Sequence, residues 1–306
     1  MDNEFIIIPS TKEKSLAATI AGKLDVPVGD YTLKQVLGSE TSITIDSYVN
    51  YKKIFLLYNI TQPINESIMQ ILFLCDALRK EGAEKVYLIT TYFPYTKMMA
   101  RNEYNLNLDL FARLLKEVNI DLVYVFGLYN PRIVNYTKIP ICNIPLITIF
   151  GKTLDDNFTN NKNLLITAID HAMHEETNEI AKHVSSKTFF PIRKEVNGKV
   201  EFEVNYDVSG KDILVIIDTI NTAATLIKFA NLLTYKGARN ISVFSTHGIL
   251  DKSAIPDIEK SVVKQIFTIT HSFSKSEKIR VVSISKIIEE IIKRTIEKKN
   301  LKSLLK

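Results

Sequence analysis

The stretch from Asp212 to Thr225, DILVIIDTINTAAT, constrains the fold of this chain more than any other. A continuous apolar run, Ile213–Ile217, ends at Asp218, and a short polar turn then opens the helical stretch Leu226–Lys236. An apolar run of this length before a turn and a helix is typical of a central parallel strand in an α/β sheet. The sequence therefore predicts an α/β fold built around this strand.

The turn after this strand is the first candidate binding site. In parallel sheets, the loop that leaves the carboxyl end of a strand at a helix N-terminus can bind anions, because backbone N–H groups and the helix dipole face outward there. Thr222 and Thr225 add hydroxyl donors, and Asp218 can bind sugar hydroxyls or a metal. The alternative is a strand-to-helix turn that threonine caps without any ligand.

Composition sets the broad class of the protein. The chain has 306 residues, 46% of them hydrophobic and 24% charged, which is typical of a globular protein with room for two domains. The start of the chain lacks the basic region of a signal peptide, and no apolar run is long enough to span a bilayer. The two cysteines, Cys75 and Cys142, lie in apolar stretches, which favours core thiols of a reduced, cytoplasmic protein. The basic C-terminal stretch carries an isoleucine stripe, which favours a packed helix over a membrane or nucleic-acid surface.

Short apolar runs alternate with amphipathic helical stretches along the whole chain, which predicts two similar α/β halves. We predict domains at residues 1–148 and 149–306, joined around residues 145–160, where LDDNFTNNKN (residues 154–163) is the most linker-like composition, and the last helix can pack on the N-terminal domain. The predicted strands are Glu4–Pro9, Val36–Ile45, Lys53–Tyr58, Val86–Thr90, Leu122–Phe126, Leu164–Ile169, Thr188–Phe190, Val200–Val204, Ile241–Ser245, Gln265–Ile269 and Val281–Ile284.

The central loop also resembles that of a known family. IIDTINTAAT, followed by a helix and by GARNISVFSTHGIL, is similar to the ribose-phosphate-binding loop of the ribose-phosphate pyrophosphokinases (PRPP synthetases), whose loop reads Asp-Asp-x-x-Asp-Thr-Gly-Gly-Thr. Shorter matches such as TQPINESIM and KVYLITTYFPY follow in order over nearly the whole chain. The resemblance implies an α/β fold of two phosphoribosyltransferase-type (Rossmann-like) domains, each with a mostly parallel central sheet.

The same resemblance suggests which residues of the second half bind ligands. Asp218, Asn221, Thr222, Ala223, Ala224 and Thr225 would form the phosphate and ribose site, Asp170 would bind metal, and Arg193 and Lys194 would be the catalytic cations. Ile217 replaces the first Asp of the motif, Asn221 replaces the third, and Ala223 and Ala224 replace the two glycines. Alanine hinders any loop conformation with positive φ. Alternatively, Arg193 and Lys194 are ordinary charges on a surface β-hairpin. His171 and His174 have the His-x-x-His spacing of a metal site, but histidines in a strand-to-helix loop are more often solvated or hydrogen-bonded.

In the first half, the resemblance implies a nucleotide site made by Glu40, Tyr92, Phe93 and Lys97. The family's Arg-Gln-Asp after this aromatic segment is replaced by Lys97, Met98 and Met99. A lysine offers a point charge but not the bidentate fork of arginine, and methionine cannot donate to phosphate. The family's metal-binding His is replaced by Tyr129.

These departures affect both substrate sites, and they decide the expected function. We expect a divergent PRPP synthetase homologue, similar to the family's associated proteins, with little or no diphosphokinase activity and a regulatory or structural role. Two alternatives remain: an active diphosphokinase that uses Mg²⁺ to transfer diphosphate from ATP to ribose 5-phosphate or a related phosphosugar, or a sensor that binds a phosphoribosyl ligand or nucleotide. The resemblance also implies self-association as a dimer or hexamer, or a heteromer with an active synthetase.

Overall fold

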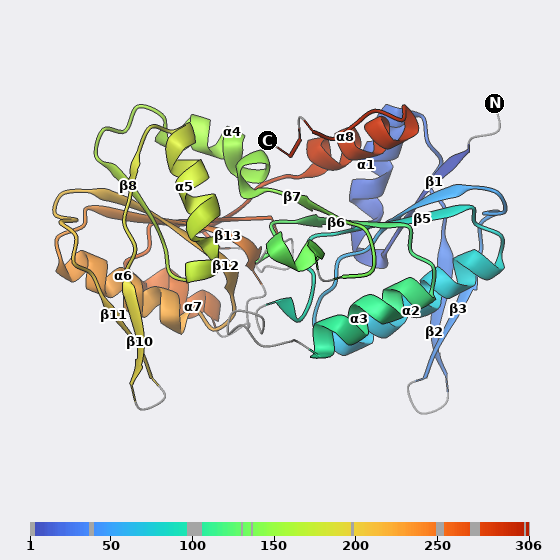
Figure 1. Cartoon of the computed structure of the whole chain (residues 1–306), viewed down its shortest axis with the longest axis horizontal. Helices are drawn as coiled ribbons and strands as arrows, with labels where there is room; N and C mark the ends of the chain where they lie inside the picture. Colours follow the sequence, from blue (N-terminus) through green and yellow to red (C-terminus); the bar gives the residue numbers. More distant parts are fainter. Residues whose placement is uncertain are drawn as a thin grey trace. The chain divides into compact units, whose positions relative to one another are not determined.

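In the computed structural model, the chain forms two compact units (Figure 1). The N-terminal unit holds residues 1–144 and 284–305, and the C-terminal unit holds residues 145–283. None of the helices described is long and apolar enough to cross a membrane. The structure describes residues 4–36, 40–96, 106–129, 131–135, 137–196, 199–248, 254–269, 276–302 and 304–305.

A five-stranded parallel sheet forms the centre of the N-terminal unit, in the order β1-β4-β5-β6-β7. Helices α1 and α8 cover one face of this sheet, and α2 and α3 cover the other (Figure 1). Both faces are therefore buried, which explains the continuous apolar strands. The strands are β1 (Phe5–Pro9), β4 (Lys53–Leu57), β5 (Lys85–Thr90), β6 (Leu122–Phe126) and β7 (Ile141–Ile144). The helices are the short η1 (Thr11–Glu13) and η4 (Pro131–Asn135), with α1 (Lys14–Leu24), α2 (Ile64–Lys80), α3 (Leu106–Glu117) and α8 (Ser285–Ile296).

Helix α8 belongs to the N-terminal unit although it follows the C-terminal unit in the sequence. Its Glu289 accepts a hydrogen bond from Lys23 of α1 at 2.8 Å, and the Thr295 hydroxyl lies 3.0 Å from that of Tyr124 on β6. The isoleucine stripe predicted to pack does so, because Ile288, Ile291 and Ile292 are buried.

The expected strand at 36–45 is wrong in its extent. The structure has an antiparallel ribbon there, with β2 (Tyr31–Val36) paired to β3 (Glu40–Ile45). On β3, exposed and half-buried residues alternate, so only one face of the ribbon is shielded. The same alternation is visible in the sequence and indicated a strand, but its partner β2, just before it in the chain, was not predicted.

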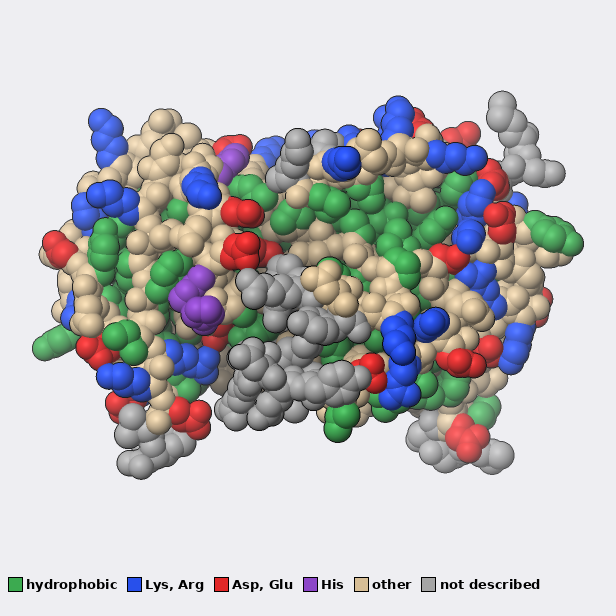
Figure 2. All heavy atoms as spheres, in the orientation of Figure 1, with side chains coloured by type: hydrophobic (Ala, Val, Ile, Leu, Met, Phe, Trp, Pro, Cys, Tyr) green, Lys and Arg blue, Asp and Glu red, His purple; other side chains and the backbone are tan. Residues whose placement is uncertain are grey.

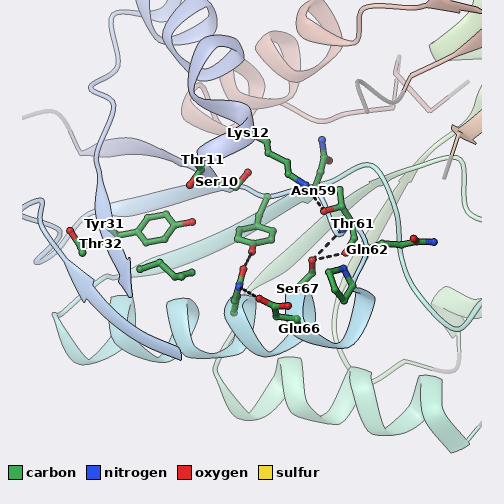
Figure 3. A pocket seen from close by; sticks show the side chains of 14 residues that line it. Ser10, Thr11, Lys12, Tyr31, Thr32, Asn59, Thr61, Gln62, Glu66 and Ser67 are labelled. Atoms are coloured by element: carbon green, nitrogen blue, oxygen red, sulfur yellow. Dashed lines mark hydrogen bonds between the residues drawn. The ribbon is translucent and has the colours of Figure 1, made fainter. Parts of the chain in front are cut away.

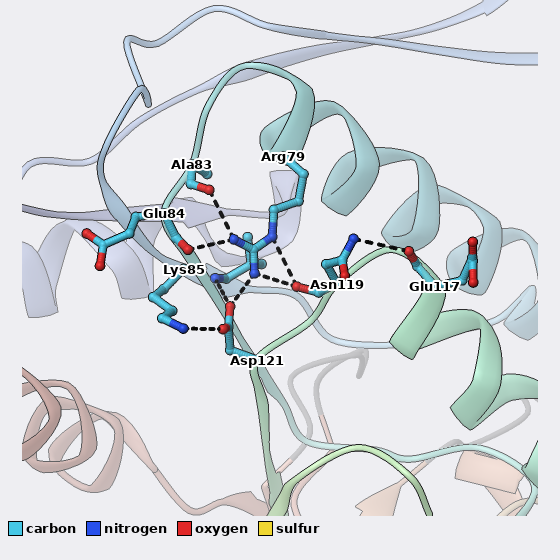
Figure 4. A network of polar contacts seen from close by, with 8 residues as sticks. Arg79, Ala83, Glu84, Lys85, Glu117, Asn119 and Asp121 are labelled. Atoms are coloured by element: carbon cyan, nitrogen blue, oxygen red, sulfur yellow. Dashed lines mark hydrogen bonds and ion pairs between the residues drawn. The ribbon is translucent and has the colours of Figure 1, made fainter.

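Arg79 fixes the end of α2 to the starts of neighbouring strands (Figure 4). Its guanidinium donates to the backbone carbonyls of Ala83, Glu84 and Asn119 and to the Asp121 carboxylate. The side chain of Arg79 is only 20% exposed, so these charge-assisted bonds are partly shielded from water. They tie the two loops that precede β5 and β6 to one side chain.

The C-terminal unit is built on a six-stranded parallel sheet in the order β15-β14-β13-β12-β8-β9. Helices α4 and α5 lie on one face, and α6 and α7 on the other (Figure 1). The strands are β8 (Leu164–Ala168), β9 (Lys187–Thr188), β12 (Asp212–Ile220), β13 (Asn240–Gly248), β14 (Gln265–Thr268) and β15 (Ile279–Val281). An antiparallel hairpin joins β10 (Ile192–Val196) to β11 (Lys199–Glu203). The helices are α4 (Leu146–Phe158), the short η5 (His171–Met173), α5 (His174–His183), α6 (Ala224–Tyr235) and α7 (Ala254–Lys260).

Strand β12, which contains the apolar run Ile213–Ile217, lies in the interior of this sheet. Strand β12 lies between β8 and β13, and its residues 213–218 are all buried. On one face its Val215 shares a core cluster with Phe229 of α6. On the other, Phe150 of α4 stacks on Phe244 of β13, with ring centroids 4.4 Å apart. Full burial of each large apolar side chain contributes roughly 1.5–3 kcal/mol, so these layers fix the strand ends that carry the site.

The expected linker at residues 145–160 is mostly helix instead. Residues 146–158 form α4, which buries Leu146, Ile149, Phe150, Leu154 and Phe158. Their spacing of three and four residues is a helical stripe. Its polar end, rich in Asp and Asn, obscured that periodicity in the sequence.

Candidate functional site

The candidate site of the C-terminal unit lies at the carboxyl edge of its sheet. Strands β8 and β12 pair in parallel, with Ala168 opposite Ile216. Asp170 and Asp218 each lie two residues further along the chain, so both are at the carboxyl edge of the sheet. Strand β13 brings His247 to this edge, opposite Thr219. Ligands of open α/β sheets bind at this edge. The two carboxylates named from the sequence are therefore neighbours in register.

Asp170 is held by an arginine. Arg193 Nη1 donates to Asp170 Oδ1 at 2.5 Å, and the Asp170 side chain is 14% exposed. Lys194 instead donates to Glu203 Oε2 at 2.8 Å across the hairpin. Successive side chains on a strand point to opposite faces, which separates the two cations. The expected metal ligand and one expected catalytic cation thus form an ion pair with each other.

Asp218 is buried rather than open to solvent. Its side chain is 2% exposed, and Thr219 Oγ1 donates to Oδ2 at 2.6 Å. The Nε2 of His247, itself buried, lies 3.6 Å from Oδ1. A ligand hydroxyl would have to displace these groups in order to reach the Asp218 carboxylate.

The loop between β12 and α6 leads into a helix N-terminus, a place where an anion can bind. Asn221, Thr222 and Ala224 are exposed, and Thr225 is half-buried in the first turn of α6. No side-chain cap hydrogen bond occurs at the N-cap Ala223. The first-turn amides of a helix lack partners within the helix, so here they can serve an anion.

Ala223 adopts the conformation that the sequence analysis regarded as unfavourable for alanine. Its φ is +60° and its ψ −8°, in the left-handed region. Glycine enters this region at no steric cost, whereas other L-residues lose roughly 1–2 kcal/mol there. The loop therefore has a backbone suited to glycine although the glycine is gone.

Two histidines lie beside this edge but do not form a metal centre. The rings of His171 and His174 are 4.6 Å apart, and His174 stacks on Phe190 at 3.7 Å. Figure 2 shows histidine side chains gathered on the surface of the C-terminal unit. Burial, with the nearby His171, lowers the pKa of His174 to about 4, so it is neutral at pH 7.

The carboxylates of this site do not fit Mg²⁺, which takes oxygen ligands in near-ideal octahedral geometry. A guanidinium neutralises Asp170, and Asp218 is buried beside an imidazole. Among the residues that the structure describes, no three His, Cys, Asp or Glu side chains come together as a metal site. We therefore derive no chemical step through a metal.

A buried carboxyl that the sequence did not reveal lies close to this edge. Glu176 on α5 is 8% exposed, and its Oε2 has no hydrogen-bond partner among the described residues. Burial raises its pKa to about 8, and the charges of Glu179, Asp218 and Glu175 add to the effect. A glutamate on a helix gives no sign of burial by itself. Only its helical spacing from the buried Met173, three residues before it, and Ile180, four residues after it, could have suggested it.

The residues expected to bind nucleotide belong to the N-terminal unit. Glu40 is exposed at the start of β3, and Tyr92 is half-buried. Phe93 is 1% exposed and its ring lies 5.1 Å from that of Phe111, so it is a core residue in this structure. Lys97 lies outside the described residues.

Comparisons with known proteins match both units. Residues 5–118 match a model described as the N-terminal domain of ribose phosphate pyrophosphokinase. Residues 162–306 match a model described as the phosphoribosyl synthetase-associated domain. Both units thus match models named for ribose-phosphate synthesis.

Full-length relatives agree with these matches. The ribose-phosphate pyrophosphokinase of Clostridium acetobutylicum is 26% identical over 291 residues, covering 92% of this chain and 91% of the relative. That of Rhizobium meliloti is 25% identical, covering 97% and 99%. The crystal structure of phosphoribosylpyrophosphate synthetase from Mycobacterium smegmatis superposes with a TM-score of 0.87 at 21% identity, covering 96% of this chain and 99% of that one. The predicted α/β fold with two mainly parallel sheets is confirmed.

Proposed function

Because this chain belongs to the ribose-phosphate pyrophosphokinase (PRPP synthetase) family, we propose that it is a divergent member with impaired or absent diphosphokinase activity. It acts as a regulatory or structural subunit in phosphoribosyl diphosphate metabolism, in the manner of the family's associated proteins. We place this role in the cytoplasm.

One observation carries the proposal: both carboxylates at the sheet edge already have internal partners. Asp170 is paired with Arg193, and Asp218 is buried beside His247. Transfer of a phosphoryl-type group depends on positioned metal ions and cations near the moving phosphates. Loss of one such preorganised group costs roughly 3–4 kcal/mol of barrier, and here several are replaced or engaged.

The loop after β12 supports retained binding of a phosphate. Asn221 and Thr222 offer exposed amide and hydroxyl groups there, and Thr225 adds a half-buried hydroxyl, at the N-terminus of a helix whose N-cap Ala223 makes no side-chain cap. Anion binding of this kind uses the backbone, so it does not need the lost acidic side chains. A phosphoribosyl compound or a nucleotide is the ligand that we propose for this loop.

An apolar surface on the N-terminal unit supports assembly. Tyr95 connects α2 and α3, since its hydroxyl donates to Asn65 on α2 and its ring contacts Phe111 on α3. The two helices expose large apolar side chains at helical spacing, with exposures between 37% and 71%: Met69 and Phe73 on α2, and Leu106, Leu110 and Leu114 on α3. Exposed apolar groups that gather in this way mark association surfaces. We propose self-association, or a heteromer with an active synthetase, through this surface.

The activity test is an assay of AMP release from ATP with ribose 5-phosphate and Mg²⁺, on protein purified away from any host synthetase. We expect turnover at the level of the blank, and no change in Asp218→Asn. Turnover that Asp218→Asn abolishes would refute the proposal and show an active diphosphokinase. Adding the chain to an active synthetase should change that enzyme's rate or size. Saturable ligand binding with no such effect would favour the sensor alternative.

The assembly test compares two variants by light scattering after size exclusion. The double variant Phe73→Ser, Leu110→Ser should lower the molar mass of the assembly. Tyr235→Ser is the matched control, because Tyr235 is 89% exposed but lies on α6, in the other unit. Equal behaviour of the two variants would remove α2 and α3 from the interface.

A further inference from the structure

The N-terminal unit contains a cavity that the proposed function does not use. It has a volume of about 540 Å³ and lies past the carboxyl ends of the neighbouring strands β1 and β4, between η1, β2 and the first half of α2 (Figure 3). This volume lies within the range of small-molecule sites, and this edge of a parallel sheet is where such ligands bind.

Two opposite charges line the cavity without neutralising each other. Lys12 Nζ donates to Thr61 Oγ1 at 2.9 Å, and Glu66 accepts from Gln70 Nε2 at 3.1 Å. Neither side chain forms an ion pair with any residue in the described part of the chain. The ammonium keeps two further donors, and the carboxylate keeps most of its acceptor capacity. The cavity thus offers one place for an anion and another for hydroxyl donors.

Hydrogen bonds hold the floor of the cavity in place. The Tyr58 hydroxyl donates to Gln70 Oε1 at 2.5 Å, which orients the amide that meets Glu66. Asn59 donates to the buried Glu13 at 2.7 Å and accepts from the Thr91 amide at 2.9 Å. Because these partners fix one another, the polar groups need little reorganisation when a ligand enters.

The remaining lining selects the class of ligand. Ser10, Thr11 and Thr32 contribute neutral hydroxyl groups, and Tyr31 contributes an aromatic ring. A purely apolar ligand would leave these polar groups without water or partners. A ligand with several anionic groups would meet a single ammonium and be repelled by Glu66. A small polar ring with one anionic group meets both conditions.

We propose that this cavity, the Lys12–Glu66 pocket, binds a small polyhydroxylated molecule with one anionic group, of the sugar monophosphate class. The phosphate lies against Lys12 and the hydroxyls beside it. The sugar hydroxyls donate to Glu66, and one face of the sugar covers the Tyr31 ring. The residues that line this pocket belong to the N-terminal unit, whereas the loop after β12 belongs to the C-terminal unit.

The test titrates the full chain with glucose 6-phosphate, ribose 5-phosphate and glycerol 3-phosphate by calorimetry. Glucose and inorganic phosphate are titrated as controls, because each represents one half of a sugar phosphate. At least one sugar phosphate should bind more tightly than either half. Lys12→Gln and Glu66→Gln should each weaken that binding about tenfold or more, since each removes a charge-assisted hydrogen bond. Lys34→Gln, an exposed lysine on β2 outside the cavity, should leave it unchanged.

Three results would overturn the proposal. The first is the absence of saturable binding for all three phosphates, and the second is equal weakening by Lys12→Gln and Lys34→Gln. The third is binding that Thr225→Val removes and Lys12→Gln does not, which would place the ligand on the loop after β12. Lys12 and Glu66 are both exposed, so thermal unfolding of these variants should match that of the parent chain.

Discussion

Replacing Glu176 by glutamine should stabilise the protein, by an amount that depends on pH. The folded chain holds this carboxyl in a buried place where its pKa is raised from 4.5 to about 8, chiefly by burial. In the unfolded chain the same group ionises near its ordinary value. At pH 7 folding must therefore bind a proton that the unfolded chain releases.

The sign of the effect follows from this proton. Stability falls as the pH rises from about 4.5, and the fall levels off above about 8, since the folded carboxyl then ionises as well. One pKa unit corresponds to about 1.4 kcal/mol, so Glu176 opposes folding by roughly 3 kcal/mol at pH 7. Glutamine keeps the shape and cannot ionise. Glu176→Gln should recover this free energy at pH 7 and almost none at pH 4.5.

Scanning calorimetry between pH 4.5 and 8.5 measures this difference. A gain of 3 kcal/mol corresponds to a rise in Tm of roughly 6–12 °C for a unit of this size. The control is Glu195→Gln, at an exposed glutamate on β10 in the same unit, which should change the Tm little. Equal gains at pH 5 and pH 8, or a loss of stability at pH 7, would refute a protonated Glu176.

Three further substitutions, each measured by thermal or urea unfolding, test the conformation of Ala223 and the hydrogen bonds of Arg79 and Asp212. Ala223→Gly should stabilise the chain by roughly 0.5–1 kcal/mol, because the left-handed conformation no longer costs a side-chain clash; no gain would show that the loop is unstrained. Arg79→Lys should destabilise by roughly 2 kcal/mol, since lysine cannot make the forked contacts to three carbonyls and Asp121; a change below 0.5 kcal/mol would refute this role. Hydrogen bonds, first that from Arg239, lower the pKa of Asp212 below its ordinary 3.8, so Asp212→Asn should destabilise the chain at pH 7 by an amount that shrinks as the pH falls below about 3.8. A loss that does not vary with pH would contradict this.

The buried strands could be predicted because their signal is local. The run at residues 213–217 is apolar throughout, and a strand buried on both faces requires just that pattern. A surface hairpin that carries Arg193 and Lys194 was predicted only as an alternative, and the structure contains this hairpin, formed by β10 and β11. Helix α4 was missed because its apolar stripe runs beside Asp and Asn residues that are typical of loops.

The site was less predictable, because it depends on contacts between distant residues. Nothing in the sequence says that Arg193 rather than Lys194 meets Asp170, since a shift of one residue along β10 would exchange them. The burial of Glu176 depends on how α5 packs. The φ of Ala223 depends on how tightly the loop joins β12 to α6.

The proposed phosphate binding and the family's catalysis would rest on different parts of this chain, so one can persist when the other is lost. The proposed anion site after β12 would use backbone amides at the start of α6, and the fold fixes their position. At Ala223 the loop has a left-handed conformation, which is unfavourable for the residue present. Catalysis instead needs charged side chains that are free to meet a substrate and a metal. Asp170 and Asp218 are retained, but Arg193 holds one and burial closes the other. We therefore propose a binding subunit rather than a diphosphokinase, because the proposed phosphate site lies beside carboxylates that are already engaged.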